Sequence, residues 1–211
     1  MAMAIALLIA VPVGILSAVR PNSNADKAGT VLAMSGVAIP DFWLGIMLIY
    51  VFSVWLKVLP PSGYAPISQG LWPSLQSMLL PALSLGMALS AVVMRQLRSA
   101  LLEVLQQDYV MVARAKGLRE TVVVGRHALK NALIPVVTVI GLQTGRLFGG
   151  AVVVETIFAL PGLGRLAADS IFFRDFPMLQ GVVLILALAV VLANLLTDLL
   201  YAFLDPRIRY R

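Results

Sequence analysis

Five stretches of this sequence are apolar over about the thickness of a lipid bilayer. The first holds nineteen residues without a charged side chain, residues 1–19. A helix rises about 1.5 Å per residue, so this stretch reaches ~28 Å, close to one hydrocarbon core. The other four are residues 31–56, 71–94, 133–158 and 179–204. The pattern predicts an all-α, polytopic membrane helix bundle of about five transmembrane helices, forming one domain over residues 1–211.

The composition also indicates a membrane protein. Hydrophobic residues make up 60% of the chain and charged residues 12%, whereas soluble domains contain about 25% charged residues. The net charge of +6 could suggest nucleic acid as a partner, but the cations lie beside apolar stretches without interleaved aromatic residues. We therefore expect no nucleic-acid binding. The chain has no cysteine, which excludes disulfides, thiolate metal sites and cysteine nucleophiles.

The first apolar stretch has an alternative interpretation as a secretory signal peptide. Signal peptides carry positive charge before the apolar core, whereas Arg20 and Lys27 follow it here. A transmembrane helix is the favoured interpretation.

The cations predict the orientation, because cytoplasmic loops retain Lys and Arg. With the N-terminus outside, twelve of the 16 Lys and Arg lie inside, three lie outside and Arg146 lies within a span. The inside residues are Arg20, Lys27, Arg95, Arg98, Arg114, Lys116, Arg119, Arg126, Lys130, Arg207, Arg209 and Arg211, and the outside residues are Lys57, Arg165 and Arg174. We expect a cytoplasmic C-terminus.

Four ionisable residues lie within predicted spans, and three of them, Asp41, Arg146 and Glu155, are the candidates for interior positions. Such groups are costly in lipid, so we expect them to face the bundle interior or a substrate pathway. Two have alternatives: Asp41 follows Pro40 and could begin a helix that starts later, and Glu155 is near the outer boundary and could be hydrated. Arg146 lies mid-span and could escape only by snorkelling.

The longest polar interval, residues 95–132, is the candidate functional site. Apolar residues continue at helical spacing beyond Arg95, which predicts an amphipathic extension of the third span down to about Lys116. Gly117 interrupts this helix, and a second helix begins at about Thr121. The result is a helix-turn-helix that projects from the membrane and could transmit force. The alternative is a passive basic loop that only sets the topology.

Several sequence blocks extend the interpretation. In chain order they are IPDFWLGIMLIY, LPPSGY, LPALSLG, DYVMVARAKGL followed by RHALKNALIP, GGAVVVETIFALPGLGRL and LLYAFLDPRIRYR. In order and content they resemble the permease subunits of binding-protein-dependent ABC importers of the dipeptide, oligopeptide and nickel family. The block DYVMVARAKGL followed by RHALKNALIP is similar to the cytoplasmic "EAA" loop of that family. It departs where the Glu-Ala-Ala should stand, since Met111, Val112 and Ala113 occupy those positions, and the motif's proline is displaced to Pro135.

The resemblance implies a transport subunit and no enzyme. The implied ATPase-coupling residues are Ala113, Arg114, Ala115, Lys116, Gly117, Leu118, Arg119 and Glu120. The implied partners are a homologous second permease, two cytoplasmic ATP-binding subunits carrying ATP and magnesium, an extracytoplasmic solute-binding protein and membrane lipid. The implied location is a bacterial or archaeal cell membrane, the inner one in Gram-negative cells. Family members usually begin with another helix and an outer domain before the segment that opens here at Met1, so an N-terminal truncation is expected.

Other function classes find less support in the residues. No phosphate-binding loop ending in Gly-Lys-Ser or Gly-Lys-Thr occurs, so ATP would bind on another chain. The single histidine, His127, lies in the basic loop, and we expect no catalytic, metal or cofactor site in this chain. An ion-gradient-driven carrier is the alternative, with Asp41, Arg146, Glu155 and Asp198 as its relay. Peptides, nickel chelates and glutathione are the candidate substrates, and the sequence does not choose among them.

Overall fold

The computed structural model describes the backbone of residues 1–204 and the side chains of residues 1–145, 147 and 151–199. This part of the chain contains helices and no strand, as predicted. The elements are α1 (Ala2–Val19), α2 (Asn24–Ala38), α3 (Asp41–Leu48), η1 (Ile49–Trp55), η2 (Ile67–Gln69), α4 (Leu71–Leu105), α5 (Asp108–Ala115), α6 (Glu120–Val122), η3 (Val123–Ala128), α7 (Leu129–Ile157), α8 (Leu163–Phe172) and α9 (Phe176–Leu204).

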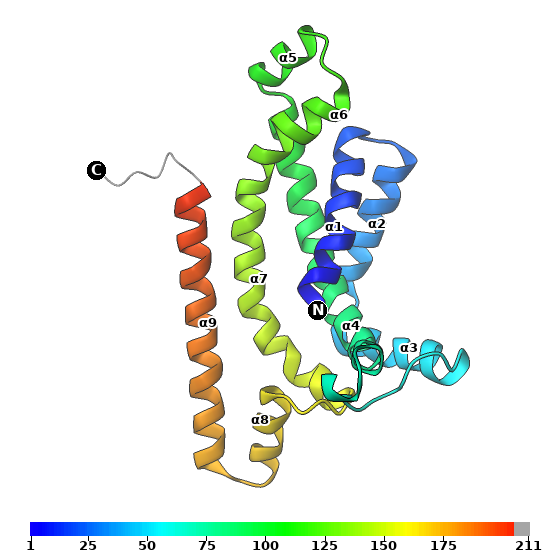
Figure 1. Ribbon diagram of the computed structural model, residues 1–211, viewed down its shortest axis with the longest axis vertical. Helices are drawn as coiled ribbons and strands as arrows, with labels where there is room; N and C mark the ends of the chain where they lie inside the picture. Colours follow the sequence, from blue (N-terminus) through cyan, green and yellow to red (C-terminus); the bar gives the residue numbers. More distant parts are fainter. Residues whose placement is uncertain (205–211) are drawn as a thin grey trace.

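The long helices run side by side along one axis, with α4 at the centre (Figure 1). Helix α4 packs against α1, α2 and α7, and α9 packs against α7 alone among the long helices. Four helical segments of the described chain are long and apolar enough to cross a membrane, and the bent pair α2 and α3 makes a fifth candidate. The prediction of about five spans is confirmed.

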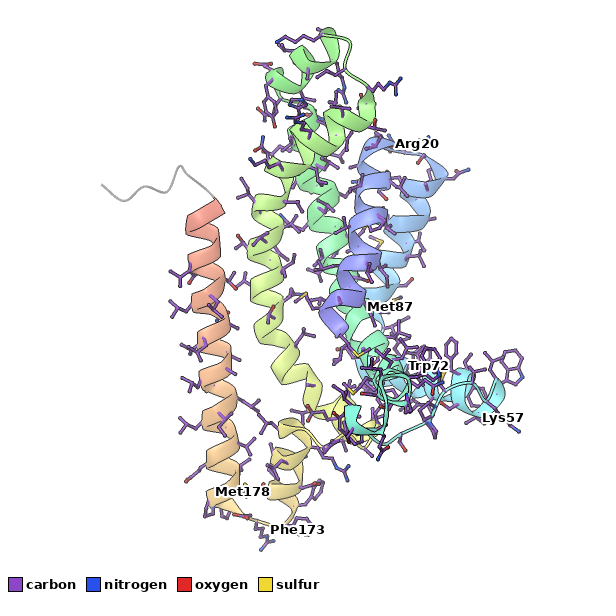
Figure 2. The ribbon with its side chains drawn as sticks, in the orientation of Figure 1. Arg20, Lys57, Trp72, Met87, Phe173 and Met178 are labelled. Carbon is purple, nitrogen blue, oxygen red and sulfur yellow. The ribbon has the colours of Figure 1, made fainter. Side chains whose placement is uncertain are left out.

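Two of the cations assigned to opposite sides lie at opposite ends of the bundle. Arg20 lies at the end from which α5 and α6 project, whereas Lys57, Trp72, Phe173 and Met178 lie at the opposite end (Figure 2). The separation agrees with the sides assigned to Arg20 and Lys57 from the sequence. The predicted inside cations Arg207, Arg209 and Arg211 fall outside the described residues.

The span predicted over residues 31–56 is sharply broken at the proline rather than crossing the bundle as one helix. Helix α2 ends at Ala38, α3 begins at Asp41, and the two are bent by 103°. The break falls at Pro40, which lacks a backbone N–H and disfavours helical geometry in the preceding residue. As a result, α3 crosses the end of the bundle instead of continuing along it (Figure 1). The helix-start interpretation of Asp41 is therefore correct.

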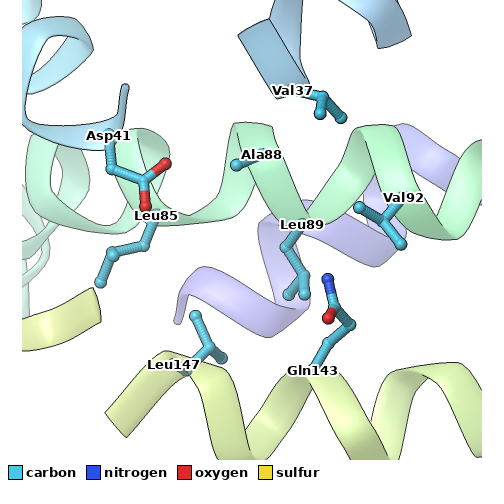
Figure 3. Close-up of a pocket in the computed structure, with 8 residues that line it drawn as sticks. All are labelled: Val37, Asp41, Leu85, Ala88, Leu89, Val92, Gln143 and Leu147. Atoms are coloured by element: carbon cyan, nitrogen blue, oxygen red, sulfur yellow. The ribbon is translucent and has the colours of Figure 1, made fainter. Parts of the chain in front are cut away.

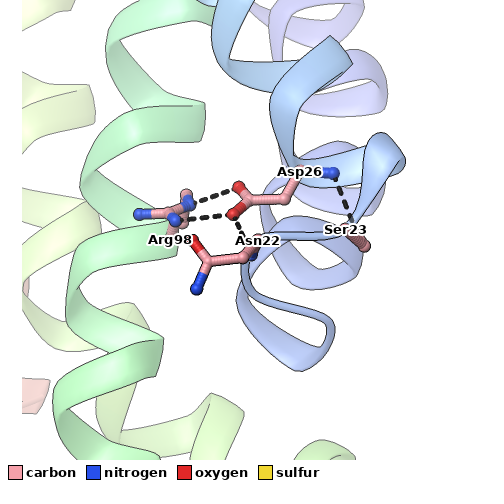
Figure 4. A network of polar contacts seen from close by, with 4 residues as sticks. All are labelled: Asn22, Ser23, Asp26 and Arg98. Carbon is pink, nitrogen blue, oxygen red and sulfur yellow. Dashed lines mark hydrogen bonds and ion pairs between the residues drawn. The ribbon is translucent and has the colours of Figure 1, made fainter.

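An ion pair at the α5 and α6 end ties the first two helices to α4 (Figure 4). The Arg98 side chain of α4 donates two hydrogen bonds to the Asp26 carboxylate, at 2.6 and 2.8 Å. The backbone N–H of Asn22 donates to the same carboxylate at 2.9 Å, and Ser23 caps α2 by accepting from the Asp26 N–H. The pair holds the turn between α1 and α2 in place.

Candidate functional site

The basic loop is built from two arms, and only one is continuous with a span. The predicted extension of the third span beyond Arg95 is confirmed as far as Leu105, where α4 ends. Its continuation to Lys116 is wrong, because α5 is a separate helix. Gln107 has an extended backbone, with φ −73° and ψ 147°, which stops the first helix. The second arm starts at Glu120, within one residue of the prediction, and stays helical through η3 and α7 to Ile157. Six of its residues, in η3, form a π-helix.

The break at Gly117 is confirmed. Gly117 has φ +76°, a conformation that side-chain-bearing residues rarely adopt. Its N–H donates to the Arg114 carbonyl at 2.9 Å, and the Leu118 N–H donates to the Ala113 carbonyl at 3.4 Å. These two bonds form the Schellman motif that commonly ends helices. The glycine therefore sets the direction in which the chain leaves α5.

An ion pair closes this turn. Arg114 donates two hydrogen bonds to the Glu120 carboxylate, at 2.6 and 3.2 Å, and so joins the end of α5 to the start of α6. The hydrogen bond to Glu120 raises the pKa of Arg114 above its ordinary value. Both side chains are exposed, so the pair contributes only about 0.2–1 kcal/mol and mainly fixes geometry.

One face of α5 packs against the chain itself. Val110 and Ala113 are buried in an apolar cluster with residues of α4, η3 and α7, including Leu101 and Val123. The Asn131 amide of α7 also donates to the Tyr109 hydroxyl at 2.7 Å. Ala113, one of the expected coupling residues, therefore belongs to the core of the loop and has no surface to offer a partner.

The opposite face of the loop is exposed in the described part of the chain. Tyr109, Met111, Val112 and Leu118 are 40–52% exposed. The remaining expected coupling residues, Arg114, Ala115, Lys116, Gly117, Leu118, Arg119 and Glu120, are also exposed. Exposed apolar side chains surrounded by charged ones are typical of a protein-docking surface.

The three ionisable candidates for interior positions have different surroundings. Asp41 is the first residue of α3 and lines a cavity between α2, α3, α4 and α7. The backbone of Arg146 lies in α7, but its side chain falls outside the described part of the structure, so its interior placement remains a prediction.

Glu155 is half-buried and hydrogen-bonded to the chain, and its place in a pathway stays a prediction. Its carboxylate accepts a hydrogen bond of 2.9 Å from the backbone N–H of Arg165, in the first turn of α8. A Cβ at Gly162 would lie 2.2 Å from the Glu155 carboxyl carbon, and one at Gly164 would lie 2.6 Å from the Cα of Val152. The glycines of the Pro-Gly-Leu-Gly segment thus form a cradle for a carboxylate at a helix N-terminus, where negative charge is favourable. Sequence analysis missed this role, although the two closely spaced glycines were its signal.

The chain is similar to known proteins over nearly its whole length. A family described as "Binding-protein-dependent transport system inner membrane component" matches residues 10–210. The chain belongs to this family. It is 48% identical to the glutathione transport system permease protein of Pectobacterium atrosepticum, covering 99% of this chain and 66% of that protein. It is 45% identical to an oligopeptide permease protein of Bacillus subtilis, covering 98% and 66%, and 43% identical to a dipeptide permease protein of Escherichia coli, covering 100% and 69%.

Membership of this inner-membrane family confirms the resemblance noted in the sequence. The fold is also shared with an inward-facing structure of the MetNI methionine ABC transporter, with a TM-score of 0.76 at 18% identity over 97% of this chain and 89% of that one. Together with the four or five candidate spans, these similarities identify a multi-pass membrane protein. The chain spans about two thirds of the length of the curated relatives it matches.

Proposed function

We propose that this chain is the transmembrane permease subunit of an ATP-driven importer. It forms half of the substrate pathway together with a homologous second permease. Two cytoplasmic subunits bind ATP and magnesium, and an extracytoplasmic solute-binding protein delivers the substrate. The chain itself carries out no chemistry. Its family and the permeases to which it is 43–48% identical support this proposal.

The observation that carries the coupling role is the helical path from the loop tip into the bundle. The chain is helical without interruption from Glu120 to Ile157. Helix α5 is held against this arm by the Arg114–Glu120 ion pair and the Asn131–Tyr109 hydrogen bond. A force applied at the exposed face of α5 would therefore tilt α7 as a rigid element instead of being absorbed by a flexible loop. This is what coupling to an ATPase requires.

The proposed substrate is a peptide or a related small solute such as glutathione or a nickel chelate. The names of the relatives support the first two, since they are permeases for glutathione, oligopeptides and dipeptides. Glutathione is itself a small peptide, so one class of chemistry covers all three. Uptake of dipeptides, longer peptides, glutathione and nickel by the reconstituted complex would assign the substrate.

The proposed location is the bacterial or archaeal cell membrane, with the basic loop and the C-terminus in the cytoplasm. The chain has no native cysteine, so single cysteines can report the orientation. Ser62 and Gln107 are both exposed, in the loop before α4 and in the turn before α5. Ser62→Cys should react with an impermeant maleimide from outside, and Gln107→Cys only after permeabilisation. Labelling of Gln107→Cys from outside would show that the chain has the opposite orientation.

The energy source separates the importer from an ion-gradient-driven carrier. In proteoliposomes that contain both permeases and both ATPases, with the solute-binding protein outside, uptake should require ATP inside, on the side of the basic loop. It should survive an ionophore. Co-purification of the chain with the ATPase subunits should depend on residues 108–120. Uptake that persists without ATP and stops with the ionophore would favour the carrier.

A further inference from the structure

A cavity of about 230 Å³ opens beside the bend between α2 and α3. Figure 3 shows Asp41 from α3 and Gln143 from α7 on its wall, together with aliphatic side chains such as Leu85, Leu89 and Leu147. The bend at Pro40 creates this arrangement, because it turns α3 across the bundle and leaves Asp41 at the corner. Asp41 is the only charged residue among the lining residues described.

The Asp41 carboxylate has no countercharge among the described side chains. The ion pairs found there involve Asp26, Glu120 and Asp169, and none involves Asp41. A carboxylate next to aliphatic walls in a membrane domain is unfavourable unless water or a cation compensates it. The N-terminus of α3 compensates this charge only in part, and a cation in the cavity would complete the compensation.

The chemistry of the lining favours an ammonium group over a metal ion. No group of three or more acidic, histidine or cysteine side chains that could hold a metal occurs in the part of the chain that the structure describes. An ammonium group needs only acceptor atoms, because it brings three N–H donors of its own. The aliphatic wall would contact the apolar carbon atoms next to such a group.

We propose that this cavity binds the protonated amine end of a transported substrate, with Asp41 accepting the ammonium group and the aliphatic wall contacting the neighbouring side chain. The proposal rests on the importer function and names a determinant of its specificity. The cavity is smaller than the ~300–1,000 Å³ of sites that enclose drug-sized ligands. It would take one residue of a peptide and leave the rest in the space shared with the second permease.

The test compares two probes that differ at the amine, which acetylation makes neutral and enlarges, and the variants below separate charge from size. L-leucinamide carries an ammonium group and an isobutyl side chain, and N-acetyl-L-leucinamide has the same side chain without the charge. Equilibrium binding is measured on the purified full-length permease complex in nanodiscs, without binding protein. We expect L-leucinamide to bind about tenfold more tightly, as a hydrogen-bonded charge pair predicts. Equal binding of the two probes, or no detectable binding of L-leucinamide, overturns the proposal.

Three variants assign the preference to Asp41. Asp41→Asn keeps the shape of the side chain and should bind the two probes equally, whereas Asp41→Glu should keep the preference for L-leucinamide. Asp169→Asn removes an exposed carboxylate of α8 and should leave the affinity for both probes unchanged. A preference that survives in Asp41→Asn refutes the proposal. ATP-driven uptake by the wild-type complex is measured in parallel, because its absence would refute the importer function and leave the binding result as a separate finding.

Discussion

The ion pair between Asp26 and Arg98 provides the sharpest test of how this fold is held together. The Asp26 side chain is 5% exposed and the Arg98 side chain 29%, so the two partners should respond differently to loss of the other. In Asp26→Asn, the guanidinium loses both charge-assisted bonds but can turn toward water. In Arg98→Gln, the carboxylate stays buried and keeps the bonds from the Asn22 N–H and the Thr30 side chain, without a countercharge.

This difference sets the order of the effects. Removing one partner of a buried ion pair costs about 3–5 kcal/mol, and partial exposure reduces the cost. We therefore expect about 2 kcal/mol of lost stability for Asp26→Asn and about 3 kcal/mol for Arg98→Gln. The double variant should cost less than the sum by about 1–3 kcal/mol, because the second substitution removes a group that the first left unpaired.

The assay is reversible unfolding of the purified subunit in mixed micelles with increasing SDS, followed by circular dichroism. Asp169→Asn is the matched control, since it breaks an ion pair of 3.7 Å whose side chains are 41% and 51% exposed. Its effect should stay below about 1 kcal/mol. The ion pair does not hold the fold as described if Asp26→Asn loses as little unfolding free energy as this control. The same conclusion follows if the two single effects add without coupling in the double variant.

Three further substitutions test the basic loop and the α8 cradle. Ala113→Asp should unfold the loop and abolish ATPase co-purification, because Ala113 is 6% exposed, whereas Ala115→Asp on the exposed face should leave the loop resistant to trypsin. Gly117→Val should weaken co-purification through backbone strain of about 1–2 kcal/mol, with normal membrane expression; unchanged co-purification would refute this role. Gly164→Ala should lower stability by about 1–3 kcal/mol because its Cβ would meet backbone, while Gly125→Ala, with open space around it, should be neutral; equal melting temperatures would contradict the cradle.

Local properties of the sequence determined the class of the protein and the number of its spans. Apolar length is a property of each segment alone, so a stretch such as residues 1–19 predicts its helix without knowledge of its neighbours. The break at Gly117 was predictable for the same reason, since the demand for positive φ arises within one turn. The resemblance to the permease family also follows from sequence blocks in order.

Tertiary structure decided which groups meet. Asp26 and Arg98 are 72 residues apart in the sequence, and nothing in either local pattern predicts their contact. Ala113 and Ala115 lie two residues apart on one short helix, yet the first is buried and the second exposed. Helical periodicity shows that a face is apolar, but it does not show whether the chain itself or a partner covers that face. Likewise, Pro40 predicts a break, and only the packing of α3 against α4 and α7 sets its direction and brings Asp41 to a cavity.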